Sequence, residues 1–304
     1  MELMKDKYQG AIHTITIGDP AKGNALSIGG QTTMPFLFDE GSVPRAPVIA
    51  YEIWDCEPTD WPEALKGSWK DALKDPVIWA RAAKALGAKA LCVRLQSVHQ
   101  DWGNAPIDSS VETLKKIAAQ AGLPLIVIGC GDDTKDNELM PKASQALKGT
   151  YALLGIATQN NYKTLAVTCL ADGHSIVAES PIDVNIAKQL NILIGDMGFD
   201  TKRIVMHPTT ASLGYGMEYV YSIMERARLA AFIGDATLSS PFIMFVGQES
   251  WRVKESKEYE DALGVNWEAA TAVSMIQSGA DILVMRHPAA AQATAKYIDS
   301  IMRR

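Results

Sequence analysis

Short apolar runs alternate with amphipathic segments along most of the chain. From residue 48 onward, a run of β-branched and aliphatic residues is followed by a loop, then by apolar positions at helical spacing, and often by a glycine before the next run. Runs that are apolar at nearly every position are typical of strands covered on both faces. The pattern predicts eight strands, at 48–53, 90–95, 125–128, 151–154, 165–168, 203–206, 242–246 and 282–285.

Helix start and stop signals stand between these runs. Asp75 followed by Pro76 predicts an N-cap with proline in the first turn, and Gly87 predicts the end of that helix. Ser109 and Glu112 have the spacing of a capping box. Further signals predict an end at Gly122, a start at Ser180-Pro181 with Asp183, and a helix over Met217–Phe232.

The repeat of strands and helices predicts the fold. Eight strand–helix units in about 255 residues have the number and length of a (β/α)8 TIM barrel, an α/β fold. A doubly wound sheet is the alternative, but its glycine-rich first turn, GxGxxG, does not occur in this sequence.

Residues 1–47 do not follow the repeat. Segments 12–17 and 25–30 alternate between apolar and polar residues and are joined by GDPAKGN, which predicts a β-hairpin. We therefore divide the chain into an N-terminal extension, residues 1–47, and a barrel, residues 48–304. A hairpin in this position is expected to plug the N-terminal mouth of the barrel.

The composition argues against several classes of protein. The chain has 304 residues, of which 47% are hydrophobic and 21% charged, and a formal charge of −6. It therefore has a globular composition and lacks the basic excess that nucleic-acid binding needs. No apolar run is long enough to span a bilayer and the N-terminus has no signal-peptide core, so we expect a cytoplasmic protein without a membrane partner.

The cysteine spacing bears on metal binding. The four cysteines Cys56, Cys92, Cys130 and Cys169 form no CxxC pair. This spacing argues against a zinc site or an iron–sulfur cluster held by this chain alone. We expect the cysteines to be buried thiols of a protein in a reducing compartment.

Polar side chains gather where the predicted strands end, which is the functional face of a barrel of this kind. The positions concerned are 55–56, 96, 99–100, 129–133, 158–161, 172–174, 207–210, 247–251 and 286–288. The motifs HExxH and GxSxG are absent and no lysine stands at a strand end, so we assign no catalytic residue and no metal ligand. This rim favours contact with a polar, amide-bearing ligand or with a protein.

Aromatic residues near the rim suggest a protein interface. Segment 55–72 has the pattern of a long polar loop after the first strand, and loops of that length are usually functional. Trp61, Trp69, Trp102 and Trp251 fall in predicted loops, and exposed aromatic residues are enriched at interfaces. We expect replacement of Trp102 or Trp251 by alanine to weaken assembly more than monomer stability.

Four motifs resemble one family. The segment IVMHPTTASLGYGMEYVYSIMERARLAAF (204–232) is similar to a signature of the small subunit of the corrinoid iron–sulfur protein, which corresponds to the delta subunit of acetyl-CoA decarbonylase/synthase. SIGGQTTMPF (27–36), FVGQESWRVKES (245–256) and DILVMRHPAA (281–290) agree in the same order. The resemblance covers nearly the whole chain. One departure is His207, where many relatives have Asp before Pro-Thr-Thr.

The resemblance implies a (β/α)8 barrel that pairs with a large subunit. The large subunit would supply the [4Fe–4S] cluster and the corrinoid-binding domain, and a corrinoid (cobamide, B12) would lie between that domain and the barrel. The complex would receive a methyl group from methyltetrahydrofolate through a separate methyltransferase. It would pass the methyl group to acetyl-CoA synthase in the reductive acetyl-CoA pathway of anaerobes.

The same resemblance, combined with the polar rim, gives a set of candidate cofactor-binding residues. They are His207, Thr209, Thr210, Gln159, Asn160, Gln248 and Arg286. A barrel without its own catalytic residues that helps to hold and cover the corrinoid is the preferred interpretation.

Two alternatives stay open at this point. A stand-alone methyltransferase would bind methyltetrahydrofolate in the barrel mouth, and by analogy with pterin-dependent methyltransferases Asn160, Asn161, Asp172 and Asp55 would contact the pterin. An unrelated barrel lyase or aldolase would need a lysine or a metal site at the mouth, and the sequence offers neither.

Overall fold

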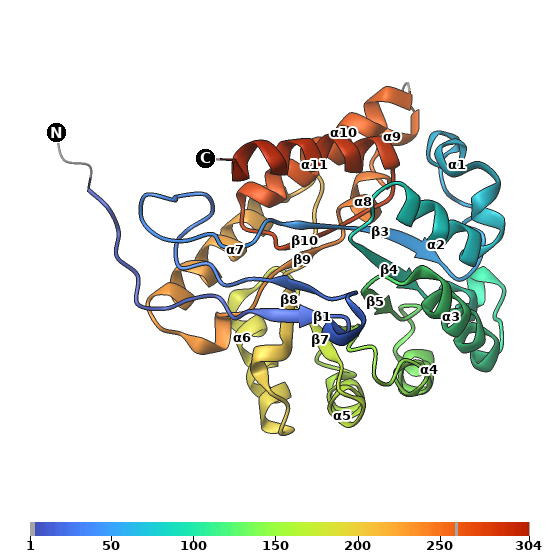
Figure 1. Ribbon diagram of the computed structural model, residues 1–304, viewed down its shortest axis with the longest axis horizontal. Helices are drawn as coiled ribbons and strands as arrows, with labels where there is room; N and C mark the ends of the chain where they lie inside the picture. Colours follow the sequence, from blue (N-terminus) through green and yellow to red (C-terminus); the bar gives the residue numbers. More distant parts are fainter. Residues whose placement is uncertain (1–3, 259–260, 304) are drawn as a thin grey trace.

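The chain folds into a barrel of parallel strands surrounded by helices (Figure 1). The structure, a computed structural model, describes residues 4–258 and 261–303. Within this part of the chain the barrel strands form one sheet in the order β8-β7-β6-β5-β4-β3-β10-β9. A parallel bridge between Met206 and Phe242 joins the two ends of the sheet. The predicted (β/α)8 barrel is confirmed.

The barrel strands are short and almost entirely buried. Because successive side chains of a strand point to opposite faces, alternate residues such as Ala50, Cys92 and Val284 fill the interior of the barrel. The strands are β3 Val48–Trp54, β4 Ala90–Arg94, β5 Leu125–Ile128, β6 Leu153–Ala157, β7 Ser175–Glu179, β8 Ile204–His207, β9 Ile243–Met244 and β10 Ile282–Met285.

Helices cover the outside of the barrel. The helix predicted over Met217–Phe232 is confirmed. No helix in residues 4–258 or 261–303 is long and apolar enough to cross a membrane. The helices are α1 Glu63–Trp69, α2 Pro76–Ala85, α3 Ile107–Ala121, α4 Asp133–Ala146, α5 Tyr162–Asp172, α6 Val184–Asp196, α7 Met217–Phe232, α8 Val246–Ser250, α9 Lys254–Glu258, α10 Asp261–Gln277 and α11 Pro288–Met302.

Most of the predicted helix ends are confirmed, and one is wrong. The Asp75 side chain caps α2 by accepting hydrogen bonds from the backbone N–H groups of Val77 and Ile78. Asp183 caps α6 in the same way, and Gly122 ends α3 with a left-handed φ of 58°. The capping box at Ser109 and Glu112 does not form. Helix α3 begins earlier, directly after Pro106, whose fixed φ suits a helix start.

One predicted strand is a helix and one strand was missed. Residues 165–168 lie inside α5, where Leu165, Ala166 and Cys169 are buried while Val167 is 51% exposed. The apolar run of this segment therefore covers one face of a helix and part of its outer surface. The strand of this repeat is β7, directly after the helix-ending Gly173. The predicted strand at 151–154 also lies further along the chain, as β6.

The N-terminal hairpin closes one end of the barrel. Strands β1 (Ile15–Ile17) and β2 (Leu26–Ile28) pair antiparallel, as predicted. Ile15, Ile17 and Ile28 are buried in the same apolar cluster as the inward side chains of the barrel strands. The Gly18 N–H donates to the carbonyl oxygen of Tyr151, just before β6 begins. The hairpin thus seals the N-terminal mouth and leaves the opposite mouth for function.

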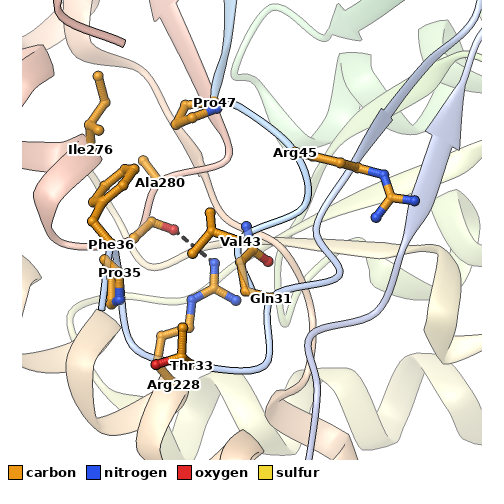
Figure 2. A pocket seen from close by; sticks show the side chains of 11 residues that line it. Gln31, Thr33, Pro35, Phe36, Val43, Arg45, Pro47, Arg228, Ile276 and Ala280 are labelled. Carbon is orange, nitrogen blue, oxygen red and sulfur yellow. Dashed lines mark hydrogen bonds between the residues drawn. The ribbon is translucent and has the colours of Figure 1, made fainter. Parts of the chain in front are cut away.

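A buried ion pair anchors the segment that follows the hairpin. Arg228 of α7 donates to Asp281 Oδ2 at 2.6 Å, and Gln31 Nε2 donates to Asp281 Oδ1 at 2.6 Å. Figure 2 shows Arg228 among side chains of the segment that includes Gln31, Thr33 and Phe36, around a small pocket. This network ties the N-terminal extension to the closed end of the barrel.

The tryptophans predicted to be exposed are mostly buried. Segment 55–72 is not a plain loop, because it contains α1. Trp61, Trp69 and Trp251 are 4%, 5% and 2% exposed, and Trp102 is half-buried. Edge-to-face contacts connect Trp102, Trp54, Trp61, Trp79 and Trp69 in a row. The prediction of exposed interface anchors is therefore wrong for Trp61, Trp69 and Trp251.

Candidate ligand site at the barrel mouth

A buried carboxylate organises the open mouth of the barrel. Glu52 lies inside β3, fully buried, and its Oε1 accepts hydrogen bonds from Trp54 Nε1 at 2.7 Å, Arg286 at 2.8 Å and Arg94 Nε at 3.2 Å. Burial alone would raise the pKa of this carboxyl, but the two guanidinium groups outweigh burial and lower the pKa to about 2. Glu52 is therefore ionised and fixes both arginines.

A cavity lies directly above this ion cluster. Its volume is about 330 Å³, and its floor is formed by Arg94 and Arg286. Arg94 also donates to Gln248 Oε1 at 2.6 Å, and the Arg286 guanidinium lies 4.7 Å from the centre of the Trp61 ring. The lining combines cations, amides and aromatic rings: Trp54, Asp60, Trp61, Pro62, Arg94, Gln96, Trp102, Cys130, Gly131, Gln248, Trp251, Arg252, Lys257 and Arg286.

A second buried glutamate supports the backbone behind Arg286. Glu268 of α10 is fully buried and accepts hydrogen bonds from the N–H groups of Arg286, His287 and the Trp251 indole at 2.6, 3.0 and 2.7 Å. Burial raises the pKa of Glu268 to about 7, although the three donors oppose the shift. The carboxyl holds the end of β10 and the start of α11 in place.

His207 occupies another part of the mouth. Its Nδ1 lies 2.8 Å from Glu179 Oε2 and its Nε2 lies 3.1 Å from Thr210 Oγ1. Burial opposes ionisation of Glu179, but the contact with His207 outweighs it and lowers the pKa of this carboxyl. Because an ionised carboxylate only accepts hydrogen bonds, Nδ1 of His207 carries a proton. Thr210 Oγ1 accepts in addition from the Phe245 N–H.

The candidate cofactor-binding residues fall into three places. Gln248 and Arg286 line the cavity. His207 and Thr210 are buried together, and the Thr209 hydroxyl donates to the Ser180 carbonyl oxygen, with a left-handed φ of 66° at Thr209. Gln159 and Asn160 are exposed after β6, where Asn160 donates to Asp133 at 3.2 Å.

Some candidates lie away from the mouth, because one strand was predicted wrongly. Residues 172–174 precede β7, at the end of the barrel that the hairpin closes. There His174 is fully buried, and its Nδ1 accepts a hydrogen bond from the Ala152 N–H while Nε2 contacts the Ser144 carbonyl oxygen. Burial lowers the pKa of His174. It holds two backbone segments together, and Asp172 cannot take part in a pterin site at the open mouth.

Other polar residues of the rim have structural partners. Burial raises the pKa of the Asp55 carboxyl, although the hydrogen bonds that it accepts from Ser97 and Ser110 oppose the shift. Asp132 caps α4, and His287 caps α11. Within the described residues, no group of three His, Cys, Asp or Glu side chains could hold a metal ion.

The charged residues of the mouth include several that sequence reasoning missed. Glu52, Arg94 and Glu179 stand inside or at the end of apolar strands, at alternate positions that point into the barrel. A charged residue within a predicted buried strand was a signal that could have found them. Glu268 stands in the middle of a helix, and no sequence pattern marked it.

Comparison with known proteins shows the family of this chain. Residues 14–296 match the family model described as CO dehydrogenase/acetyl-CoA synthase delta subunit. The acetyl-CoA decarbonylase/synthase complex subunit delta of Methanopyrus kandleri is 32% identical over 280 residues, which cover 90% of this chain and 69% of that protein. Subunit delta of Archaeoglobus fulgidus is 29% identical over an alignment of 308 positions, which covers 95% of this chain and 68% of that protein.

Solved structures support the fold independently. Dihydropteroate synthase of Xanthomonas albilineans has a TM-score of 0.62 at 13% identity, covering 95% of this chain and 99% of that chain. The enzyme of Thermus thermophilus has a TM-score of 0.59 at 14% identity, covering 94% and 98%. At such identities the likeness shows the barrel fold alone. Since the family match runs from β1 into α11, the chain belongs to the CO dehydrogenase/acetyl-CoA synthase delta subunit family.

Proposed function

We propose that this chain is the small subunit of a corrinoid iron–sulfur protein within an acetyl-CoA decarbonylase/synthase system. The observation that carries the proposal is the family match over residues 14–296, which includes every strand of the barrel and its open mouth. A large subunit would supply the [4Fe–4S] cluster and the corrinoid-binding domain. The barrel would help to hold and cover the cobamide at the interface between the two subunits, in the cytoplasm.

The donor set of the mouth fits the edge of such a cofactor. A corrin ring carries amide side chains around its edge, and amide and guanidinium groups can pair with amides as donors and acceptors. The mouth offers Gln96, Gln248 and Arg286 at the cavity. Arg286 Nε and Trp61 Nε1 are buried and have no hydrogen-bond partner within the described residues. The side chains of Gln96, Gln248 and Arg286 are therefore the groups that a ligand in the cavity would meet.

Each candidate residue has a role that follows from its place. Gln159 and Asn160, exposed after β6, would contact the cofactor or the partner at the rim. Gln248 and Arg286 would contact the edge of the corrin ring at the cavity. His207, Thr209 and Thr210 would hold the loop after β8 in place. When bound, the cobamide would supply the cobalt that carries the methyl group. This chain would position it and exclude water.

Methyl transfer requires further partners. A methyltransferase that uses methyltetrahydrofolate would donate the methyl group, and acetyl-CoA synthase would accept it. Both contacts would be transient. In the part of the chain that the structure describes, the mouth offers positioning groups, and through them the chain would contribute geometry rather than covalent chemistry.

Anaerobic purification of the native protein tests the proposal directly. We expect a complex of this chain with a larger subunit, with a corrinoid absorption spectrum that changes on reduction. A colourless chain purified alone or as a homo-oligomer would contradict the proposal. Titration with methyltetrahydrofolate then tests the alternative, a stand-alone methyltransferase, which predicts micromolar binding by the isolated chain.

A matched pair of variants tests the mouth within the complex. We expect Gln159→Ala combined with Asn160→Ala to leave folding unchanged and to lower the fraction of cobamide that the purified complex retains. Gln189→Ala is the control, because Gln189 is an exposed glutamine on α6. Equal cobamide retention in the two variants would remove Gln159 and Asn160 from the proposed contacts.

A further inference from the structure

The cavity above Glu52 has the features of an anion site. Among the described residues, four cationic side chains, Arg94, Arg252, Lys257 and Arg286, and one acidic side chain, Asp60, line it. Such a concentration of positive charge attracts anions, and the low dielectric around a cleft strengthens the attraction.

The charge on the cavity floor is balanced from within the barrel, because Glu52 and Glu268 act on Arg286, and Glu52 and Glu179 act on Arg94. One carboxylate, that of Glu52, is shared by the guanidinium groups of Arg94 and Arg286, which are 9% and 6% exposed. Glu179, at the end of β7, helps to balance the charge of Arg94. Glu249 forms an ion pair with Arg252 at 3.0 Å. Arg252 and Lys257 add positive charge to the lining, so an anion that enters the cavity meets more cationic than acidic side chains among the described residues.

Two residues of the lining also hold buried donors without partners. Arg286 Nε and Trp61 Nε1 each have no hydrogen-bond partner within the described residues, although both side chains are more than nine-tenths buried. Both residues line the cavity, and the guanidinium of Arg286 lies against the Trp61 ring at 4.7 Å. Because both nitrogen atoms are shielded from the cavity, a ligand would pair with other groups of the lining.

The size and walls of the cavity limit the ligand. Its volume of about 330 Å³ is at the lower end of the range for small-molecule sites, so it accommodates a small molecule or one side group of a larger one. The rings of Trp54, Trp61 and Trp102 form flat walls. We propose that this cavity binds a small oxyanion, a carboxylate or a phosphate, through Arg94, Arg286 and Gln248, and that a flat ligand body packs against the tryptophan walls.

The proposal is independent of cobamide binding, so the first test uses the full chain without cofactor. Tryptophan fluorescence is followed during titration with sodium phosphate, sodium acetate and sodium benzoate, and with sodium chloride at matched ionic strength. We expect saturable changes with the oxyanions and none with chloride. Benzoate should bind several-fold more tightly than acetate, because its ring reaches the aromatic walls. Absence of saturable change with every oxyanion would overturn the proposal.

Two variants connect the signal to the cavity. Gln248→Glu places a carboxylate beside Arg94 and should weaken phosphate binding at least tenfold, whereas Gln189→Glu makes the same change on the surface of α6 and should not. Lys257→Gln keeps the floor intact and should weaken binding several-fold, and Lys116→Gln on α3 is its control. Unchanged affinity in both Gln248→Glu and Lys257→Gln would overturn the assignment.

A final arm identifies the source of the anion. The phosphate titration is repeated in the assembled complex with cobamide bound. Loss of phosphate binding would show that an acidic group of the cofactor occupies the cavity, and persistence would show a separate small molecule. Either result supports an oxyanion site. Failure of the chain to bind cobamide would count against the proposed function and would leave the titrations of the free chain intact.

Discussion

Glu52 and Arg286 are 234 residues apart in the sequence, and Oε1 of the first accepts a hydrogen bond from the guanidinium of the second at 2.8 Å. The contact exists because β3 and β10 are neighbours in the barrel, in a register that pairs Tyr51 with Met285. The first and last strands of the barrel thus meet at an ion pair as well as at backbone hydrogen bonds. Closure of the barrel and construction of the mouth depend on the same carboxylate.

Replacement of Glu52 by Gln should destabilise the fold strongly. The change removes the charge that balances two mostly buried guanidinium groups, and loss of one partner of a buried ion pair costs about 3–5 kcal/mol. The free energy of unfolding, measured with urea at neutral pH, should fall by this amount. Glu112→Gln is the control, because Glu112 forms an exposed pair with Lys115 and such pairs contribute about 0–1 kcal/mol.

The same carboxyl predicts a loss of stability in acid. The pKa of Glu52 is about 2 in the folded chain, against 4.5 as the ordinary value. The folded state therefore holds a proton more weakly than the unfolded state. The resulting stability is fully present above about pH 4.5 and is lost as pH falls towards 2. Glu52→Gln should flatten this acid limb of the stability profile, and an unchanged limb would contradict the assignment.

Glu268 predicts the opposite dependence at higher pH. Its pKa is about 7 in the folded chain, so the folded state binds the proton more tightly than the unfolded state. This contribution to stability is present below about pH 4.5 and declines as pH rises to about 7. Unfolding experiments at several pH values should show that Glu268→Gln removes the decline.

The Glu268→Gln variant also has a cost that does not depend on pH. The amide of Gln has one oxygen and an NH2 group, so it cannot accept from all three N–H donors that face Glu268. An unsatisfied buried donor costs about 1–3 kcal/mol. We therefore expect lower stability at pH 8 together with a flatter profile. A profile parallel to that of the unchanged protein would show that Glu268 does not titrate in this range.

The fold could be predicted because hydrophobic periodicity follows directly from burial. Strands buried on both faces, such as β5, are apolar throughout, and caps such as Asp75 mark the helix between them. The prediction failed at 165–168, where a helix also exposes Val167 and Leu170. A short apolar run does not distinguish a buried strand from a helix with an apolar outer surface.

The site could be predicted only in part. Placement of Gln248 and Arg286 at strand ends was enough to put both at the cavity. Glu52 carried a sequence signal, a charge inside a buried strand, but its two arginine partners could not be predicted, and Glu268 carried no signal, because these contacts join distant segments. The row of tryptophans was misread for a similar reason: the sequence shows polar neighbours around Trp61 and Trp69, and only the packing of α1 and α2 against the barrel shows that the rings are inside.

Trp251 and Trp102 should respond differently to replacement by alanine. Trp251 is 2% exposed and its indole donates to Glu268, so Trp251→Ala should lower the free energy of unfolding by about 3–5 kcal/mol. Trp102 is half-buried, and its ring contacts the edge of Trp54 beside the cavity. Trp102→Ala should therefore lower the free energy of unfolding clearly less than Trp251→Ala does. Urea unfolding of both variants measures the difference. Equal losses in the free energy of unfolding would contradict the explanation from the different burial of the two side chains.

Replacement by alanine should change the free energy of unfolding in opposite directions at two glycines in short helices. In α8, a Cβ on Gly247 would lie 2.7 Å from the Arg286 backbone nitrogen and 3.0 Å from Glu268 Oε1. Gly247→Ala should therefore displace the end of β10 and lower the free energy of unfolding by about 1–3 kcal/mol, the usual cost of overpacking.

Gly67 in α1 provides the matched comparison. A Cβ there meets no other atom within 4 Å, and the residue lies within α1 on its exposed surface. Gly67→Ala should stabilise the chain by about 0.5–1 kcal/mol, because alanine loses less backbone freedom than glycine on helix formation. Since both changes add one methyl group to a helix, helix propensity alone predicts stabilisation in both. Opposite shifts of the urea midpoint would show that the contact of Gly247 with Arg286 and Glu268 decides the result, and two stabilising shifts would contradict it.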